Sequence, residues 1–282
     1  MQLSFDRLLT GSKRRITTFI PPNQLADPRD YTTRVITAAE ARAFVEEHHY
    51  SGSMPPAIHA YGLVRAGALV GVAVLSWPTN NATTQKWLGM PAGEALELGR
   101  FILLDEEGFN SETIFLAKMR RDLANRAPGL KALLAFSDPA PRSIGGQIAF
   151  RGHFGTIYQA LDNSVYLGRS SSRRLTILPD GRTLSARAIE KLKLDAESYA
   201  EKQLVSAGAP KRNPSMTGAE RISDLIDRRF LTIARHAGCH AFVLPLGCSK
   251  DRQRCQIRYD RGLERPRLTD APICVDAYQR AA

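Results

Sequence analysis

The fold class is decided by residues 58–77, which read IHAYGLVRAGALVGVAVLSW. Two apolar runs, Ile58–Arg65 and Leu69–Trp77, are joined through Ala66-Gly67, a pair that suits a tight turn. This pattern predicts an antiparallel hairpin inside a larger sheet. Working outward from it, similar apolar runs predict further strands over residues 31–36, 96–104, 130–136, 156–161 and 165–167.

Helices are expected between these strands. Thr37-Ala-Ala-Glu40 is a capping-box sequence, so a helix should begin there and end near His48. Ser111 precedes apolar residues at helical spacing, and residues 144–150 read as a short glycine-containing helix. A polar stretch over residues 78–93 reads as an excursion or lid. Strands alternating with helices in this order predict an α/β fold with a mixed central sheet.

The chain divides by composition into three parts. Residues 1–30 read as an arm that includes Lys13, Arg14 and Arg15, and residues 31–170 carry the predicted sheet. Residues 171–282 form a basic and mainly helical appendage, with helices expected around 185–207 and 217–235. This last part has 21 lysines and arginines against 13 aspartates and glutamates, a net charge of +8. Such a surplus suits a polyanion, although an ordinary solvated surface is the alternative.

Composition excludes two broad classes. With 282 residues, 43% of them hydrophobic, the chain can bury a large core, so disorder of the whole chain is excluded. No apolar run approaches the roughly 18 residues of a membrane span, and the first residues lack the apolar core of a signal peptide. We therefore expect a soluble protein of the cytoplasm with no membrane partner.

Four positions have side chains suited to chemistry. His49 stands beside Tyr50 and Ser51 in a loop, as an acid/base group at neutral pH or as a solvated residue. Arg100 lies within an apolar strand, so it needs a carboxylate or phosphate partner; Glu97 should lie on the opposite face because side chains alternate. Asp138 ends a buried strand, either as a base or as a turn former before proline. The phenol of Tyr158 is a proton donor or a packing group.

Five short motifs, taken in order, resemble those of the Mom family of phage DNA-modification proteins. They are His49-Tyr-Ser-Gly52, Glu97-Leu-Gly-Arg100, Asn110-Ser-Glu112, Phe136-Ser-Asp138 and Gly155-Thr-Ile-Tyr-Gln-Ala160. The resemblance covers roughly residues 35–170 and implies a GNAT-type acyltransferase fold. It also implies that adenine in duplex DNA is converted to its N6-carbamoylmethyl form, which protects phage DNA from restriction endonucleases.

The resemblance also implies which residues act. His49, Arg100, Ser111, Asp138 and Tyr158 match positions that the family requires, and we expect catalytic roles for His49, Arg100, Asp138 and Tyr158. The residues expected to bind substrate or donor are Tyr50, Ser51, Tyr61, Asn110, Ser111 and Gln159. Those expected to bind DNA are Arg173, Arg174, Lys211 and Arg212. The expected partners are double-stranded DNA and a small-molecule group donor, in the host cytoplasm.

The donor is left open by the sequence. A GNAT enzyme binds the pyrophosphate of coenzyme A at the N-terminus of a helix, where free amides favour an anion. Here the corresponding loop is Asp105-Glu-Glu-Gly-Phe-Asn110, whose three carboxylates would repel a pyrophosphate. The donor is therefore acyl-CoA bound unusually, or another activated acyl or aminoacyl compound.

Two other functions and a metal site stay open. The chain could be an acyl-CoA-dependent N-acyltransferase for a protein or small amine, or a non-catalytic DNA-binding protein on a GNAT scaffold. Cys239, Cys248, Cys255 and Cys274 all fall near the C-terminus, beside His240. Their spacing matches no compact zinc motif, so they are either metal ligands or ordinary buried thiols.

Overall fold

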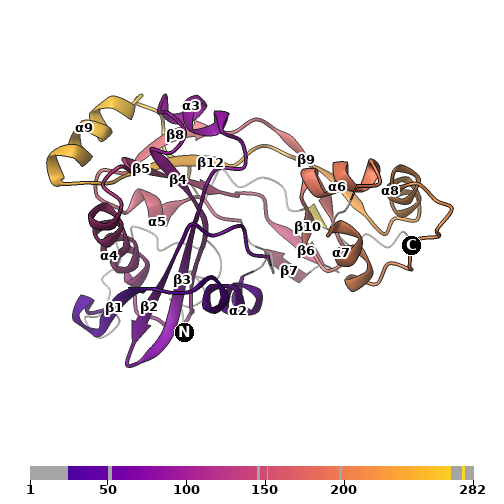
Figure 1. Cartoon of the computed structure of the whole chain (residues 1–282), viewed down its shortest axis with the longest axis horizontal. Coiled ribbons are helices and arrows are strands. Elements are labelled where there is room, and N and C mark those ends of the chain that lie inside the picture. Colours follow the sequence, from indigo (N-terminus) through magenta and orange to yellow (C-terminus); the bar gives the residue numbers. More distant parts are fainter. Residues whose placement is uncertain are drawn as a thin grey trace. The chain divides into compact units, whose positions relative to one another are not determined.

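A computed structural model describes residues 25–49, 53–144, 147–150, 152–196, 199–267 and 275–276 (Figure 1). Within it the chain forms two compact units. The first unit comprises residues 1–139, 153–170 and 239–270, and the second comprises 140–152, 171–238 and 271–282. Each unit has its own apolar core.

The first unit is built on a seven-stranded mixed sheet with strand order β1-β2-β3-β4-β5-β12-β8. Its strands are β1 (Tyr31–Val35), β2 (His59–Arg65), β3 (Ala68–Ser76), β4 (Ala95–Leu103), β5 (Ala132–Ser137), β8 (Val165–Arg169) and β12 (His240–Pro245). Neighbouring strands are antiparallel except β4 and β5, which are parallel. The predicted α/β class with a mixed central sheet is confirmed.

The hairpin of β2 and β3 forms as the sequence predicts. Ala66 and Gly67 have φ angles of 48° and 82°, the pair of positive values that a two-residue turn between antiparallel strands requires. Glycine adopts such a backbone without strain, which is why the pair at residues 66–67 turns the chain. The result places two central strands side by side over most of their length.

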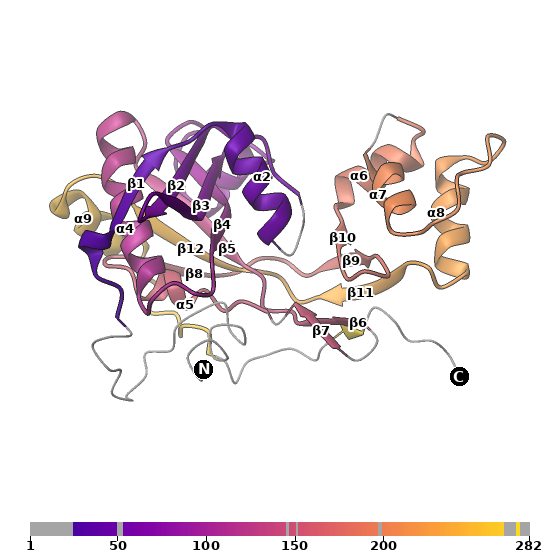
Figure 2. The same ribbon diagram turned by 90° about the horizontal axis from the view of Figure 1, so that it is seen from below.

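Two helices cover opposite faces of this sheet (Figure 2). Helix α2 (Ala38–His48) begins with the predicted capping box, in which Thr37 and Glu40 bond each other's backbone. It packs on β2, β3 and β4 through Phe44 and Val45. Helix α4 (Ser111–Arg126) covers the other face with Phe115, Met119 and neighbouring residues. We refer to these as the α2 face and the α4 face.

Strand β12 differs from the sequence expectation, which placed everything after residue 170 in one appendage. All six residues of β12 are buried, and the strand pairs with β5 on one side and β8 on the other. Arg120 of α4 donates two hydrogen bonds to the carbonyl of Pro245, at 3.1 and 2.6 Å. A strand that is apolar on both faces is stable only inside a sheet, so the chain returns to the first unit at Cys239.

Two local predictions are wrong. The described residues of 144–150 are not helical: β6 (Arg142–Ile144) and β7 (Gln147–Phe150) pair as antiparallel strands, with β13 (Val275–Asp276) beside β6. Residues 156–161 are not a strand, because Thr156–Gln159 form the short helix α5. Gly155 has a φ of 70°, and its carbonyl accepts the amides of Tyr158 and Gln159, which winds the chain into one turn.

The second unit combines three helices with a small sheet of order β10-β9-β11. Its elements are β9 (Arg173–Ile177), β10 (Thr183–Leu184), α6 (Ala186–Lys193), α7 (Ala200–Ser206), α8 (Gly218–Asp227) and β11 (Thr232–His236). The helices share an apolar core that includes Ile189, Leu204 and Leu225. Arg221 is also buried there, paired with Glu201 at 3.2 Å.

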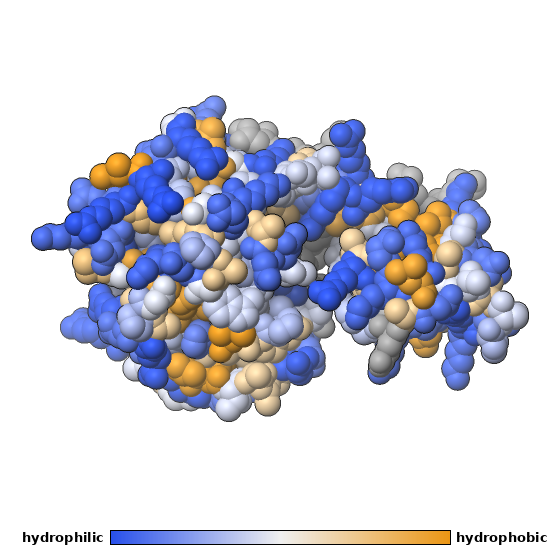
Figure 3. Space-filling view, turned by 45° about the horizontal axis from the view of Figure 1, so that its top comes forward, coloured by the Kyte–Doolittle hydropathy of each residue, from blue (hydrophilic) through white to orange (hydrophobic). Residues whose placement is uncertain are grey.

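The remaining helices are short or peripheral. The predicted lid contains α3 (Ala82–Leu88), and a 3-10 turn, η2 (Pro28–Asp30), precedes β1. Helix α9 (Ser249–Tyr259) packs on β12 and β8. No helix in the described ranges is long and apolar enough to cross a membrane. The face drawn in Figure 3 is predominantly hydrophilic over both units.

Candidate active site

A β-bulge at Gly99 determines which side chains of β4 meet. Glu97 pairs with Ser76 and Leu98 with Leu75, but Val74 then pairs with Arg100, so Gly99 is an extra residue. Directly paired residues of antiparallel strands share a face, and Ser76 and Val74 are two residues apart on β3. Glu97 and Arg100 therefore lie on the same face of the sheet. The prediction that they lie on opposite faces is wrong because it assumed an unbroken alternation.

The apolar cores on the two faces of the sheet confirm this register. Before the bulge, Leu98 packs in the core of the α4 face. After it, Ile102 packs in the core of the α2 face, as does Val74. The bulge thus brings Arg100 onto the α2 face together with Glu97. A Cβ atom added at Gly99 would lie 3.1 Å from both Pro55 Cγ and Ser76 Oγ, so the bulge is also crowded.

Arg100 holds neighbouring segments in place. Its Nε donates to the carbonyl of Ser53 at 2.8 Å and its Nη2 to the Ser53 hydroxyl at 3.1 Å. Its Nη1 donates to the carbonyl of Gly99 at 2.6 Å. The guanidinium thus fastens the segment that follows α2 to the bulge of β4. Carbonyl and hydroxyl groups, rather than only the carboxylate or phosphate that the sequence suggested, accept its hydrogen bonds.

His49 and Glu97 are the other titratable groups near Arg100. His49 is the C-cap residue of α2, and burial together with the charge of Arg100 lowers its pKa to about 3. Burial raises the pKa of Glu97, and Arg100 partly opposes this. His49 is therefore neutral at pH 7 and is suited to give or accept a hydrogen bond without carrying a positive charge.

The parallel strands β4 and β5 pair over only three residues each. The pairs are Ala95 with Ala132, Leu96 with Leu133 and Glu97 with Leu134, although β4 continues to Leu103 and β5 to Ser137. We call the facing edges beyond Glu97 and Leu134 the seam. Asp138 follows the end of β5 at this seam, and the carboxyl ends of strands are where open α/β sheets bind ligands. The placement favours the prediction that Asp138 is functional.

A second polar cluster lies on the α4 face, around His153. The ring of His153 stacks on that of Tyr158, with centroids 5.5 Å apart and an interplanar angle of 18°. Burial lowers the pKa of His153 to about 4, and the charges of Asp138, Glu112 and His240 also act on it. Glu112 is buried in the first turn of α4. This cluster joins residues from α4, α5, β12 and the end of β5.

His240 extends this cluster along β12. It pairs with Ser137 of β5, and its Nδ1 lies 2.9 Å from the hydroxyl of Tyr166. Its Nε2 lies 3.3 Å from Arg169 Nη2. The His240 side chain is therefore held by β8 groups. Sequence analysis noted His240 only as a neighbour of cysteines.

The catalytic residues expected from the sequence are divided between these two clusters. His49 and Arg100 belong to the α2 face, whereas Tyr158 belongs to the core of the α4 face, with Asp138 near it at the end of β5. The seam is bordered by residues of both groups.

The residues expected to bind substrate or donor lie in different surroundings. Tyr50 and Ser51 lie outside the described residues. Tyr61 is fully buried in the core of the α4 face, where burial and nearby Asp122 raise its pKa. The Ser111 hydroxyl donates to the carbonyl of Gly108 at 2.7 Å, beside exposed Asn110, which has a φ of 77°. Gln159 donates to the carbonyls of Phe154 and Pro266, so its amide supports the fold.

The loop before α4 does not fit a pyrophosphate. Asp105 and Glu106 are exposed carboxylates, and Glu112 places another carboxylate in the first turn of the helix. Glu107 is buried and accepts from Tyr31 Oη at 2.6 Å and from Arg65 at 3.3 Å. Glu107 is thus neutralised by partners within the fold. The negative charge expected from the sequence remains at the place where a GNAT enzyme would need amides and cations.

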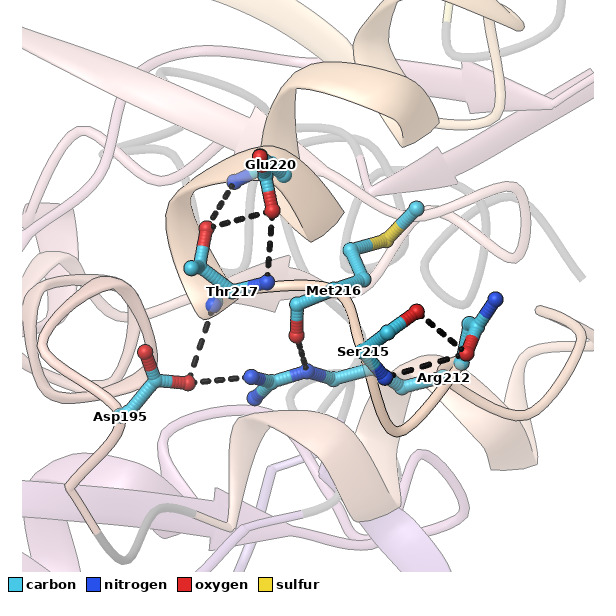
Figure 4. Close-up of polar contacts among 8 residues, drawn as sticks. Asp195, Arg212, Ser215, Met216, Thr217 and Glu220 are labelled. Atoms are coloured by element: carbon cyan, nitrogen blue, oxygen red, sulfur yellow. Dashed lines mark hydrogen bonds and ion pairs between the residues drawn. The ribbon is translucent and has the colours of Figure 1, made fainter.

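The four residues expected to bind DNA lie in the second unit. Arg173 and Arg174 are exposed on β9, and Lys211 is exposed before α8. Arg212 instead joins parts of the fold: it donates to the carbonyl of Met216 at 2.7 Å and to the carboxylate of Asp195 (Figure 4). Asp195 also accepts the amide of Gly218, next to the capping box of Thr217 and Glu220. The Arg212 guanidinium therefore anchors the start of α8 within the fold.

Cysteines do not form a metal site in the described part of the chain. Cys239 is buried, Cys248 exposed and Cys255 half-buried, all as free thiols. No group of three or more His, Cys, Asp or Glu side chains among the residues that the structure describes could hold a metal ion. Cys274 lies outside the described residues.

Sequence analysis predicted no catalytic or substrate-binding role for four residues of the second cluster, which are Glu112, His153, Tyr166 and His240. Two had a usable signal. His153 lies between Gly152 and Gly155, close before Tyr158, and His240 begins the apolar run 240–245. A polar residue at the end of a buried strand marks the edge of a sheet where a ligand can enter. His153 and His240 come close together only because β12 pairs with β5, and no local sequence pattern predicts that pairing.

The fold and this site define an α/β protein whose sheet carries buried titratable groups on both faces. Compared with family models, the chain matches that of the Mom protein family over residues 30–216. It belongs to this family. The match extends beyond residue 170, where the resemblance in the sequence motifs ended, into α6 and α7 of the second unit.

Two further comparisons add little to this. Among solved structures, the chain is similar to a tandem GNAT protein from the clavulanic acid biosynthesis pathway, at 12% sequence identity and a TM-score of 0.40. That match covers 78% of this chain and 99% of the other. A search of curated proteins finds no match. Membership of the Mom family suggests a DNA-modifying transferase.

Proposed function

We propose that this protein modifies the N6 atom of adenine in duplex phage DNA with a carbamoylmethyl-type group, in the host cytoplasm, and thereby protects the DNA from restriction. Membership of the Mom family supports the DNA substrate. The observation that carries the enzymatic role is the seam between β4 and β5. Titratable groups with displaced pKa values border it from both faces, and such groups concentrate at active sites.

Asp138 acts as the base in this proposal. N6 lies within the base pair, so the adenine is first turned out of the duplex, at a cost of a few kcal/mol. In the transfer, N6 gains a bond to the methylene carbon of an activated carbamoylmethyl donor. The donor's leaving group departs with the electrons of the bond that breaks, and the N6 proton goes to the Asp138 carboxylate.

The residues of the α2 face hold this geometry. Arg100 fastens Ser53 to the bulge of β4 and so fixes the segment beside neutral His49. Glu97, the last residue of β4 that pairs with β5, places a carboxyl with a raised pKa at the start of the seam. A carboxyl of this kind exchanges protons closer to neutral pH than an exposed one. Tyr158 lines the opposite side as a phenolic donor.

The second unit holds the DNA backbone in this proposal. Arg174 of β9 is directly paired with Arg235 of β11, and both side chains are exposed. Like charges opposite each other in a sheet destabilise it, unless an anion lies against them. Phosphates of the duplex are the polyanion that would relieve this repulsion.

The test is mass spectrometry of nucleosides from plasmid DNA of cells that express the protein. A fraction of deoxyadenosine should become a heavier nucleoside, and the plasmid should resist some restriction enzymes. Expression of the Asp138→Asn variant provides the matched control. Unchanged nucleosides, in a phage-infected host that supplies the donor and with folded protein present, would contradict the proposal and favour a non-catalytic DNA-binding role.

A further inference from the structure

His153 is held rigidly beside Asp138. Its backbone amide donates to the carbonyl of Asp138 at 2.6 Å, so the two residues are neighbours across two chain segments. Its ring is fixed twice, because Nδ1 accepts the amide of Gly155 at 2.7 Å and one face stacks on Tyr158. A side chain locked in this way has a defined direction for its remaining nitrogen.

That remaining nitrogen, Nε2, carries a proton. A neutral imidazole has one donor and one acceptor nitrogen, and Nδ1 is the acceptor here. Burial lowers the pKa of His153 to about 4, although the carboxylates of Asp138 and Glu112 act to raise it, while His240 lowers it further. At pH 7 the ring is therefore a neutral hydrogen-bond donor through Nε2.

The Nε2–H group has no protein acceptor within the described residues, and the His153 side chain is only half-buried. Desolvation without a partner costs free energy, so a donor fixed in such a place is suited to a ligand acceptor. The adjacent Asp138 carboxylate is an acceptor. The two side chains together present one donor and one acceptor next to each other.

We propose that His153 is the residue that recognises the adenine ring: its Nε2–H donates to N1 or N7, the ring acceptors on either side of the 6-amino group, while Asp138 accepts from N6–H. This rests on the proposed function and assigns a role to a residue outside the motifs. Adenine offers acceptors at N1 and N7 on either side of its N6 donor. Guanine and thymine would instead turn an exocyclic oxygen toward the Asp138 carboxylate and be repelled. Cytosine, which pairs a donor N4 with an acceptor N3, is not rejected by this pair alone.

Base analogues test this atom by atom. Duplexes are prepared in which the target adenine is replaced by 1-deaza-adenine or 7-deaza-adenine, each of which lacks one acceptor. Wild type should lose about ten- to hundred-fold in kcat/KM on one of the two analogues, because one hydrogen bond is lost and its donor is left unpaired. The other analogue serves as the matched substrate control.

Two variants separate recognition from support of the fold. In His153→Asn, the side-chain oxygen can still accept the amide of Gly155, but nothing donates from the Nε2 position. It should lose about as much on adenine as wild type loses on the sensitive analogue, and should lose nothing further there. His153→Gln places an amide N–H near the Nε2 position and should restore part of the discrimination. Circular dichroism confirms that both variants fold.

Each outcome decides between the proposals. Wild type that modifies adenine and both analogues equally well overturns the role of His153 alone. A His153→Asn variant that keeps the discrimination overturns it too. Wild type that leaves adenine itself unmodified, with an active donor supply, contradicts the proposed function and this inference together.

Discussion

The two units differ in whether burial shifts the pKa values of their described titratable groups. In the first unit, burial displaces the pKa values of His49, Glu97 and His153. In the described part of the second unit, the pKa shifts belong to exposed Asp195, lowered mainly by the hydrogen bond from Arg212, and exposed Glu220, lowered mainly by the amide of Thr217. Displaced pKa values brought about by burial accompany chemistry, whereas exposed charges accompany binding. The difference supports the proposal that the first unit carries the reaction and the second unit binds the DNA backbone.

The largest expected effect is the loss of the base. Asp138→Asn removes the proton acceptor with almost no change in shape, so modification should fall by about a hundredfold to ten-thousandfold. Mass spectrometry of plasmid nucleosides measures it. Asp162→Asn, which changes an exposed carboxylate of the same unit, is the control and should leave the rate unchanged. Full activity of Asp138→Asn would make Asp138 a turn former.

Arg100→Lys should have the next largest effect. An ammonium cannot reproduce the fork that bonds Ser53 and Gly99 from three nitrogens, so one or two hydrogen bonds are lost. At about 1 kcal/mol each, the modification rate should fall about tenfold. Arg121→Lys, on the exposed surface of α4, should behave as wild type. Equal activity of the two variants would show that only the charge of Arg100 matters.

Removing the paired arginines of the second unit should change binding and leave chemistry intact. With Arg174→Gln and Arg235→Gln combined, the slope of log K against log[salt] for duplex binding should flatten by about 2, at about 0.9 for each phosphate contact. Lys193→Gln combined with Arg228→Gln also removes two charges, but these side chains are paired with Glu190 and Asp224. If the control pair flattens the slope as much, net charge and not this surface governs binding.

The smallest expected effect is on stability between pH 6.5 and 4.5. The pKa of His49 is about 3 in the folded state against about 6.5 when unfolded, so the unfolded state binds more protons in this range. The free energy of unfolding should therefore decrease as the pH falls. In His49→Gln the decrease should be shallower, as measured by urea unfolding at several pH values. Identical pH dependence would mean that His49 is solvated and titrates normally.

Sequence patterns predicted the elements whose causes are local. The turn at Ala66-Gly67 and the capping box of Thr37 and Glu40 depend on residues within a few positions of each other, and both form. The single turn of α5 was mistaken for a strand because Gly155, with its positive φ, changes the backbone before an otherwise strand-like run. Strand β12 was missed because its partners, β5 and β8, lie far away in the sequence.

The candidate site could be predicted only in part, because some of its residues meet only through the pairing of distant strands. Asp138 could be recognised because the end of a buried strand is visible in the sequence. The meeting of Glu97 with Arg100 could not, since the bulge appears only when β3 and β4 are paired. His153 comes close to Asp138, Glu112 and His240 only after distant strands have been placed side by side.

The extra residue at Gly99 makes the length of β4 as important as its composition. If Gly99 took a regular place in the ladder instead of bulging, Arg100 would lie three alternating positions from Glu97 and change sides; deleting Gly99 would instead leave the two residues two positions apart, on the same face. Substitutions that keep two residues between Glu97 and Arg100, together with the bulge, leave their common side intact. Natural variation in this strand should consequently tolerate exchanges of residue type at Leu98 better than the insertion of one residue between Glu97 and Arg100.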